Sequence, residues 1–199
     1  MLIPNAVRRT AIALAVALAA PAAHGYIHFP PMTLKKMCEM SHHARLLKVS
    51  KCSKDKGVII FEAMESLKGN KSRISSFKHV LRPDTVGGKP ILDWVQEGKQ
   101  AVMFWIESKP DSPERGLAYV FIDDYCFSAI YSRTTNHWTI IRGEPDMSAC
   151  YCGSIEQLRG LVKDILQGKN VKVPVKNPEI KENGEQRKKE INDALNKNQ

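Results

Sequence analysis

Seven consecutive residues near the start of the chain, MCEMSHH at 37–43, carry two thioethers, a thiol, a carboxylate and two imidazoles. Thiolate and thioether sulfur suit Cu(I), whereas imidazole nitrogen suits Cu(II) or zinc. Met37, Met40, His42 and His43 are therefore candidate ligands of a copper or zinc site. Adjacent histidines at the start of a strand are expected to point to opposite faces, which argues against a shared metal.

The competing interpretation of this stretch is structural, and we favour it. Thr33 is placed to cap a short helix, LKKMCEM, that leads into the first strand. On that helix Leu34, Met37 and Cys38 would face the core, where methionine commonly fills gaps. The expectation is therefore no cofactor, with copper as the alternative.

A second metal hypothesis concerns the expected processing site. Cleavage after Gly25 would leave a chain that begins Tyr26-Ile27-His28. Its terminal amine, two backbone amides and the imidazole of His28 can surround Cu(II) in a square plane, the geometry this ion favours. The interpretation that we favour makes His28 an ordinary surface or packing residue.

The first 25 residues predict a secretory signal peptide. Arg8 and Arg9 form a short basic segment, and TAIALAVALAAPAA follows as an apolar segment too short for a comfortable membrane span. Ala23-His24-Gly25 offers a small-x-small cleavage site; cleavage after Ala22 and an uncleaved anchor are the alternatives. We therefore expect an extracytoplasmic protein, secreted or periplasmic, with no membrane span after cleavage.

The five cysteines all follow the predicted leader and would meet an oxidising compartment. An odd number allows at most two intramolecular disulfides. A hairpin around residues 133–136 should bring Cys126 close to the positions that precede Cys150 and Cys152, so a bridge between Cys126 and one of these two is expected. Cys38 would pair with the other or be the alternative partner. Cys52 lies in a charged turn and is the candidate free thiol.

The charge balance favours acidic partners. The formal net charge is +9, and about +7 remains once the two arginines of the leader are removed. We expect the partner to be a protein or an anionic surface component, such as an anionic glycan, and not a nucleic acid. A basic surface that is merely solvated is the simpler interpretation. Trp94, Trp105 and Trp138 are expected in the core or at its rim, with a carbohydrate-stacking face as the alternative.

Sequence motifs of the common enzyme classes are absent from the 199 residues, which contain no G-x-S-x-G, H-E-x-x-H, P-loop or G-x-G-x-x-G. We therefore do not expect an enzyme. An unrecognised hydrolase, the second alternative to a binding module, would need a pocket in which a carboxylate and a histidine converge. Asp123 and Asp124 close a strand, and a solvated turn is favoured there over a cation site.

The elements that must position these residues are mostly short strands. Strands are expected at 44–49, 58–67, 74–81, 101–107, 118–123, 127–132, 137–143 and, as an edge strand, 171–175. A helix is expected at 91–98, and a stronger one follows Ser154, which has Gln157 at the capping-box spacing. This pattern predicts a mainly β fold (α+β), a small closed OB-like barrel of about five to seven antiparallel strands over residues 26–176. The charged tail at 177–199 is expected to be disordered.

A family resemblance supports this fold. The run ARLLKVSKCSKDKGVIIFEAMESLKG resembles the first hairpin of netrin-like domains, which include the tissue inhibitors of metalloproteinases. Its matching features are Lys48-Val49, the ending Glu65-Ser66-Leu67-Lys68-Gly69, and Gly98 before AVMFWIE. The mature region, especially YIHFPPMTL and SACYCGSIEQLRGLVKDILQGK, is also similar to uncharacterised secreted proteins of planctomycete-type bacteria. The resemblance implies an OB-fold barrel with helices packed outside it and a general binding role.

One departure from that family limits what the resemblance implies. The metalloproteinase inhibitors chelate the zinc of their target through an amino-terminal cysteine. Here the expected first residue is Tyr26, and the first cysteine is Cys38. The inhibitory mechanism is therefore not carried over to this chain.

Overall fold

The computed structural model describes residues 32–69, 75–108 and 114–176. The predicted leader, His28 and the charged tail lie outside these ranges. The helices are α2 (Leu34–Met40), α3 (Gly88–Trp94), the 3-10 helix η1 (Pro145–Ala149) and α4 (Ile155–Leu166). The strands are β1 (His43–Ser53), β2 (Val58–Lys68), β3 (Ser76–Val86), β4 (Gln100–Glu107), β5 (Glu114–Ile122), β6 (Tyr125–Ser132) and β7 (His137–Gly143).

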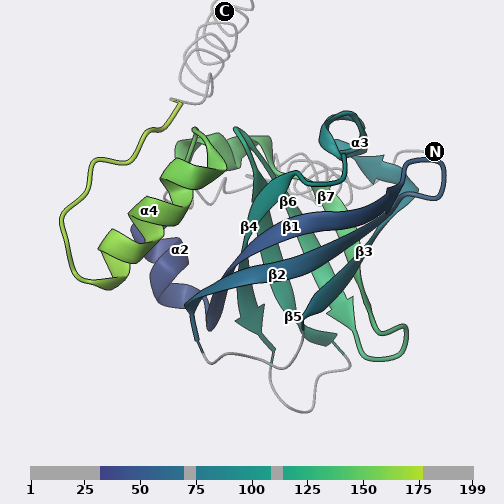
Figure 1. The fold of residues 1–199 in the computed structure, drawn as a ribbon, viewed down its shortest axis with the longest axis horizontal. Coiled ribbons are helices and arrows are strands. Elements are labelled where there is room, and N and C mark those ends of the chain that lie inside the picture. Colours follow the sequence, from purple (N-terminus) through teal and green to yellow (C-terminus); the bar gives the residue numbers. More distant parts are fainter. Residues whose placement is uncertain (1–31, 70–74, 109–113, 177–199) are drawn as a thin grey trace, which may run out of the picture. The chain divides into compact units, whose positions relative to one another are not determined.

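The strands close into a barrel in the order β1-β2-β3-β7-β6-β5-β4, which confirms the predicted small OB-like barrel (Figure 1). All neighbouring pairs are antiparallel except β3 and β7, which run parallel, with His79 opposite Trp138. A ring of seven strands cannot alternate in direction all the way round, because the number is odd. The purely antiparallel barrel that we expected from the sequence is therefore wrong at this one pair.

The interior of the barrel is one hydrophobic core, and β4 shows how the sequence fills it. Ala101, Met103 and Trp105 point into the barrel, whereas Val102 and Phe104 belong to a second core outside it. Successive side chains of a strand point to opposite faces. A strand buried on both faces must therefore be apolar throughout, which explains the continuous run AVMFWIE.

The second core lies between the outer face of the barrel and a layer formed by α2, η1 and α4 (Figure 1). The predicted caps of this layer are confirmed. Thr33 accepts a hydrogen bond from the backbone N–H of Lys36 at 3.1 Å, and Ser154 accepts one from the N–H of Gln157 at 3.3 Å. Each cap satisfies one of the amide groups that a helix leaves without a partner at its start.

The hairpins β1–β2 and β6–β7 form as the sequence predicts, although β1 runs on to Ser53, into the expected turn. Strand β3, expected at 74–81, covers Ser76–Val86. The strand expected at 171–175 is wrong, because this segment is irregular. It makes isolated backbone bonds instead: the N–H of Cys152 donates to the carbonyl of Pro174, and the N–H of Lys176 donates to the carbonyl of Ser148. Pro174 has no N–H to donate to a ladder, so pairing cannot continue through it.

The helices in the described ranges are all too short or too polar to cross a lipid bilayer.

Candidate ligand-binding site

A cavity of about 420 Å³ opens at one end of the barrel, where β3 and β7 begin and β4 and β6 end. Its lining combines four aromatic side chains with three polar ones: Phe77, Trp105, Tyr131 and Trp138, and Ser76, Lys78 and Asn136. The aromatic residues come from four different strands. The parallel β3–β7 pairing and the β6–β7 hairpin bring three of these strands together.

The aromatic walls of this cavity are held by edge-to-face contacts. The ring centroids of Trp105 and Trp138 lie 5.5 Å apart at 89°, and those of Tyr131 and Trp138 lie 5.3 Å apart at 60°. Trp105 is 9% exposed and Trp138 2% exposed, so each presents only part of its ring to the opening. Such packing gives the cavity fixed walls.

Polar groups surround the opening of the cavity. The Lys78 side chain is exposed, one residue from the inward-pointing Phe77 on β3. The hydroxyl of Tyr131 donates a hydrogen bond to the Oδ1 atom of Asn136, which fixes the tyrosine ring and the amide together. An ammonium, an amide and a hydroxyl next to aromatic rings can recognise a ring-shaped ligand that carries polar or negatively charged substituents.

His79 packs against Trp138, one of the residues that line this cavity, and is fully buried. Its ring stacks on Trp138, with centroids 5.8 Å apart at 11°, and meets Phe61 edge-on at 5.1 Å. Among the described residues neither ring nitrogen has a hydrogen-bond partner, although the Phe77 backbone is near enough to raise the pKa slightly. Burial dominates and lowers the pKa of His79 from 6.5 to about 3, so the ring remains neutral in the folded protein.

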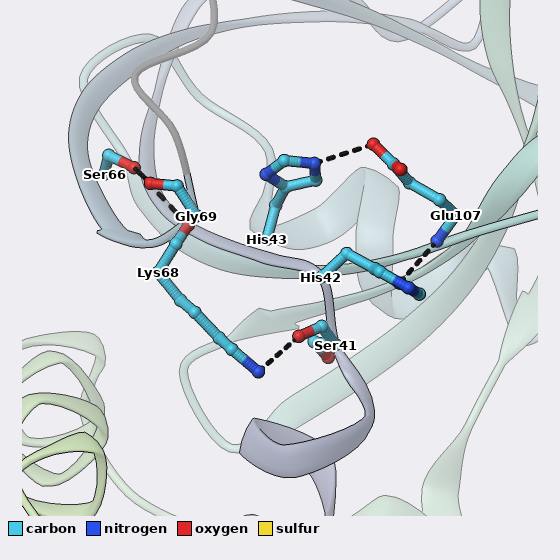
Figure 2. Close-up of polar contacts among 7 residues, drawn as sticks. All are labelled: Ser41, His42, His43, Ser66, Lys68, Gly69 and Glu107. Carbon is cyan, nitrogen blue, oxygen red and sulfur yellow. Dashed lines mark hydrogen bonds and ion pairs between the residues drawn. The ribbon is translucent and has the colours of Figure 1, made fainter.

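A second cavity, of about 570 Å³, lies at the junction of α2 and β1 and contains most of the stretch MCEMSHH. Figure 2 shows its central feature, Glu107 at the end of β4 placed between two histidines. The Nε2 atom of His43 lies 2.7 Å from the Oε1 atom of Glu107. The backbone N–H of Glu107 donates to Nδ1 of His42 at 3.1 Å. We call His42, His43 and Glu107 the histidine bracket.

Lys68 secures the helix that forms one side of this cavity (Figure 2). Its ammonium donates hydrogen bonds to the carbonyl oxygens of Cys38 and Ser41, both at 2.6 Å, and of Glu39 at 3.3 Å. The carbonyls at the end of a helix lack partners within the helix and carry partial negative charge. Lys68 therefore fixes the end of α2 against the end of β2.

The predicted metal ligands are only partly brought together. Met37 is fully buried in the second core, whereas Met40, His42 and His43 line the second cavity. The two histidine rings contact different parts of Glu107: His43 lies against the carboxylate, and His42 accepts the backbone N–H. Within the described residues no three histidine, cysteine or acidic side chains are arranged to hold a metal ion.

The expected disulfides are not formed, since the five cysteines Cys38, Cys52, Cys126, Cys150 and Cys152 are all free thiols in the structure. The β6–β7 hairpin does place Cys126 beside the start of η1, and the N–H of Glu144 donates to its carbonyl at 2.8 Å. Cys38, Cys126 and Cys150 are instead buried together in the second core, where they pack as small apolar residues. The bridges proposed for Cys126 and Cys38 are therefore wrong for this structure.

Burial also predicts which thiols react. It raises the pKa of Cys38 to about 11 and that of Cys150 to about 12, and it raises the pKa of Cys126 well above the usual value. Since the thiolate is the reactive form, iodoacetamide at neutral pH should label the half-buried Cys52 and Cys152 first. The other three should be labelled only in denaturant. Peptide mapping before and after unfolding checks this, and early labelling of Cys126 in the native protein would contradict it.

Other residues singled out in the sequence have separate roles. Trp94 lies on α3, away from the aromatic cavity, and its indole N–H donates to Asp123 at 3.1 Å. Asp124 pairs with Lys176 at 3.5 Å. The two aspartates thus contact different partners, and the three tryptophans do not form one stacking face.

Several site residues were not predicted. Tyr131 lies directly opposite Trp138 in the β6–β7 hairpin, so the predicted hairpin already implied their contact. No local pattern in the sequence marks Lys78 or Glu107 as a site residue, because their positions depend on the pairing of strands that are far apart in the sequence.

Comparisons with protein-family models, with curated proteins and with solved structures gave no match to this chain.

Proposed function

We propose that this protein is an exported binding module that holds an anionic sugar residue of an envelope or surface polymer in the aromatic cavity. One observation carries the proposal: four aromatic side chains line a cavity at the end of the barrel, with Lys78 at its opening. Aromatic rings pack against the apolar face of a sugar ring, and an ammonium group complements a carboxylate. By analogy of fold, OB barrels commonly bind oligosaccharides.

The size of the cavity and the net charge support the same ligand class. A volume of about 420 Å³ lies in the range typical of small-molecule sites, roughly 300–1,000 Å³. The formal charge of about +7 that remains after removal of the predicted leader attracts polyanions over a distance. A protein partner would instead need a complementary surface of roughly 800 Å² on each side. The resemblance to netrin-like domains is compatible with this binding role.

A hydrolase is less well supported, although a histidine and a carboxylate do converge in the second cavity. His43 and Glu107 form such a pair, but Nδ1 of His43 is buried against the backbone of Gly69. The nearby hydroxyl of Ser41 donates to the carbonyl of Met37 at 2.7 Å, inside the helix. The pair therefore lacks an accessible base atom and a nucleophile.

The proposal is tested by calorimetric titration with a galacturonate trimer and with the neutral galactose trimer. We expect the acidic trimer to bind and the neutral one to bind at least tenfold more weakly. Lys78→Gln should reduce the affinity for the acidic trimer about tenfold, since a hydrogen bond to a charged group contributes roughly 1.5 kcal/mol or more. The affinity for the neutral trimer should change little on this substitution.

Lys99→Gln is the matched control, because Lys99 is an exposed lysine at the other end of β4. It removes the same charge from the protein but not from the cavity. Equal loss of affinity in Lys78→Gln and Lys99→Gln would mean that the trimer is attracted by net charge alone. Binding of one copper equivalent that is lost in His42→Ala, without any sugar binding, would favour the metal-binding alternative.

A further inference from the structure

Asn136 occupies a turn position that fixes its side chain at the opening of the aromatic cavity. It is the last residue of the turn between β6 and β7, and its backbone N–H donates to the carbonyl of Ser132 at 2.9 Å. Its φ is +54°, a left-handed conformation that asparagine adopts more readily than most residues. The backbone thus directs the Asn136 amide group to one place, beside the hydroxyl of Tyr131.

The Tyr131 hydroxyl determines which end of this amide faces a ligand. It donates its hydrogen to Oδ1 of Asn136, so the carbonyl oxygen of the amide already has a partner. The Nδ2 group carries two N–H donors. Within the described part of the chain it donates to no other residue, and Asn136 is exposed. The Asn136 amide therefore offers donors, and not an acceptor, to a molecule in the cavity.

Lys78 is a second donor at the same opening. Its exposed side chain makes no hydrogen bond or ion pair with the residues that the structure describes, although Glu62 lies on the neighbouring strand, opposite Ser76. An ammonium group has three N–H donors and no acceptor. The donors of Lys78 are therefore also available to a ligand.

The parallel pairing of β3 with β7 places these two donors close together. His79 lies opposite Trp138 in this pairing. Lys78 comes one residue before the paired position on β3, and Asn136 comes two residues before it, where the chain enters β7. Paired strands lie about 5 Å apart. The two side chains can therefore reach one acidic group, whose oxygen atoms each accept a hydrogen bond.

We propose that Lys78 and Asn136 together bind the acidic group of the sugar, and that the Tyr131 hydroxyl positions the amide for this contact. The inference rests on the proposed function, because it concerns the ligand of the aromatic cavity. It narrows that ligand to sugars that carry the acidic group on the edge of the ring, while the apolar face of the ring meets Trp138. Sugars with a protonated amine at the same place are rejected, since that amine would face the Lys78 ammonium.

The first experiment measures the affinity of Asn136→Gly for the galacturonate trimer and for the neutral galactose trimer. Glycine suits a φ of +54°, so this substitution removes the amide and keeps the turn. The acidic trimer should bind about tenfold more weakly, the usual effect of losing a hydrogen bond to a charged group. The neutral trimer should bind as before. Equal losses for the two trimers would mean that the amide contacts a sugar hydroxyl, and the inference would be wrong.

Asn136→Asp keeps the size of the side chain and an oxygen for the Tyr131 hydroxyl, but it replaces the two donors by an acceptor. It should weaken binding of the acidic trimer more than Asn136→Gly does. Asn170→Asp is the matched control, because it adds the same charge at an exposed position beyond the end of α4. It should leave the affinity nearly unchanged. Equal losses in the two aspartate variants would assign the effect to net charge and contradict the proposed contact.

A double variant tests whether the two donors bind the same acidic group. If Lys78→Gln and Asn136→Gly each reduce the affinity about tenfold, independent contacts would combine to a loss of about a hundredfold. Donors that hold one group depend on each other, so the double variant should lose no more than about thirtyfold. A full hundredfold loss would place the two donors on different groups of the ligand, against the inference.

Nuclear magnetic resonance of the Asn136 side-chain amide separates this inference from the proposed function. The signal of its Nδ2 group is identified by its absence in Asn136→Gly. The galacturonate trimer and benzoate, a flat ring with one carboxylate, should each shift this signal in the natural sequence. The shifts should be smaller in Tyr131→Phe, where the amide is free to turn.

The outcomes of this measurement differ for the two proposals. If benzoate shifts the Asn136 signal and the sugar does not bind, the proposed sugar is wrong and the shared contact with an acidic group is supported. If the sugar binds without shifting the signal, the proposed function stands and the inference fails. The inference also fails if neither acid shifts the signal.

Discussion

Lowering the pH from 7.5 to 4.5 is expected to reduce the free energy of unfolding by about 3 kcal/mol through His79 alone. The ordinary pKa of 6.5 applies in the unfolded chain, whereas burial lowers the pKa to about 3 in the folded protein. Between these two values the unfolded state binds more protons, so stability falls as the pH falls. Each pH unit below 6.5, down to the folded-state pKa, lowers the free energy of unfolding by about 1.4 kcal/mol. Above pH 6.5 the stabilising contribution of His79 is fully present.

The measurement is urea denaturation at both pH values for the natural sequence and for His79→Leu. Leucine has nearly the volume of histidine and suits the surrounding Phe61, Phe127 and Trp138. Other groups also titrate in this range, and the comparison of the two proteins removes their contribution. His79→Leu should lose about 3 kcal/mol less than the natural sequence on acidification. An equal loss would show that His79 is not buried as described.

Substitution of Gly57 by alanine is expected to lower the free energy of unfolding by roughly 3–5 kcal/mol. Gly57 ends the β1–β2 turn with a φ of +59°, and a Cβ atom there would lie 2.2 Å from the carbonyl oxygen of Leu81. That oxygen belongs to the backbone of β3 and cannot swing away. The Leu81 N–H also donates to the carbonyl of Gly57 at 2.7 Å, so relief of the clash would break this bond.

Gly98→Ala is the matched control for this prediction. Gly98 has a similar positive φ of +88°, but a Cβ atom there would meet nothing within 4 Å. Its substitution should cost only the left-handed backbone conformation, about 1–2 kcal/mol. Urea denaturation of the two variants measures the difference. Equal losses would mean that the close approach between Gly57 and β3 does not contribute.

The part of this fold that the sequence predicts is the part set by neighbours along the chain. The cap of α4 follows from the spacing of Ser154 and Gln157, and the burial of β4 on both faces follows from its continuous apolar run. Each hairpin follows from two apolar segments around a polar turn. The same reasoning failed at 171–175, where β-branched residues around Pro174 suggest a strand but no neighbouring strand pairs with them.

The sites depend on contacts between distant segments, and local patterns do not specify these. Glu107 follows His43 by 64 residues, and only the β1–β4 pairing makes them neighbours. The burial of His79, in contrast, could have been predicted from a local pattern. Phe77, His79 and Leu81 alternate with Lys78 and Val80, so the pattern alone placed a histidine on the apolar face of β3. The structure shows the His79 ring fully buried, as this alternation indicates.

The prediction of disulfides was wrong for a different reason. The prediction of disulfides used the compartment and the number of cysteines, neither of which determines distances between side chains. Cys38, Cys126 and Cys150 do belong to one hydrophobic core, so the sequence correctly predicted that these three residues lie near one another. A disulfide requires a narrow geometry that proximity in a core does not guarantee.

The parallel pairing of β3 with β7 has a consequence for how the chain folds. It joins residues about 60 positions apart, and the β1–β4 pairing that completes the ring is also long-range. The hairpins can form early from local contacts, but the ring cannot close until both distant pairs meet. Domains rich in such contacts fold slowly, roughly in milliseconds to seconds. During that interval the edges of β3 and β7 are unpaired and can associate with those of other chains.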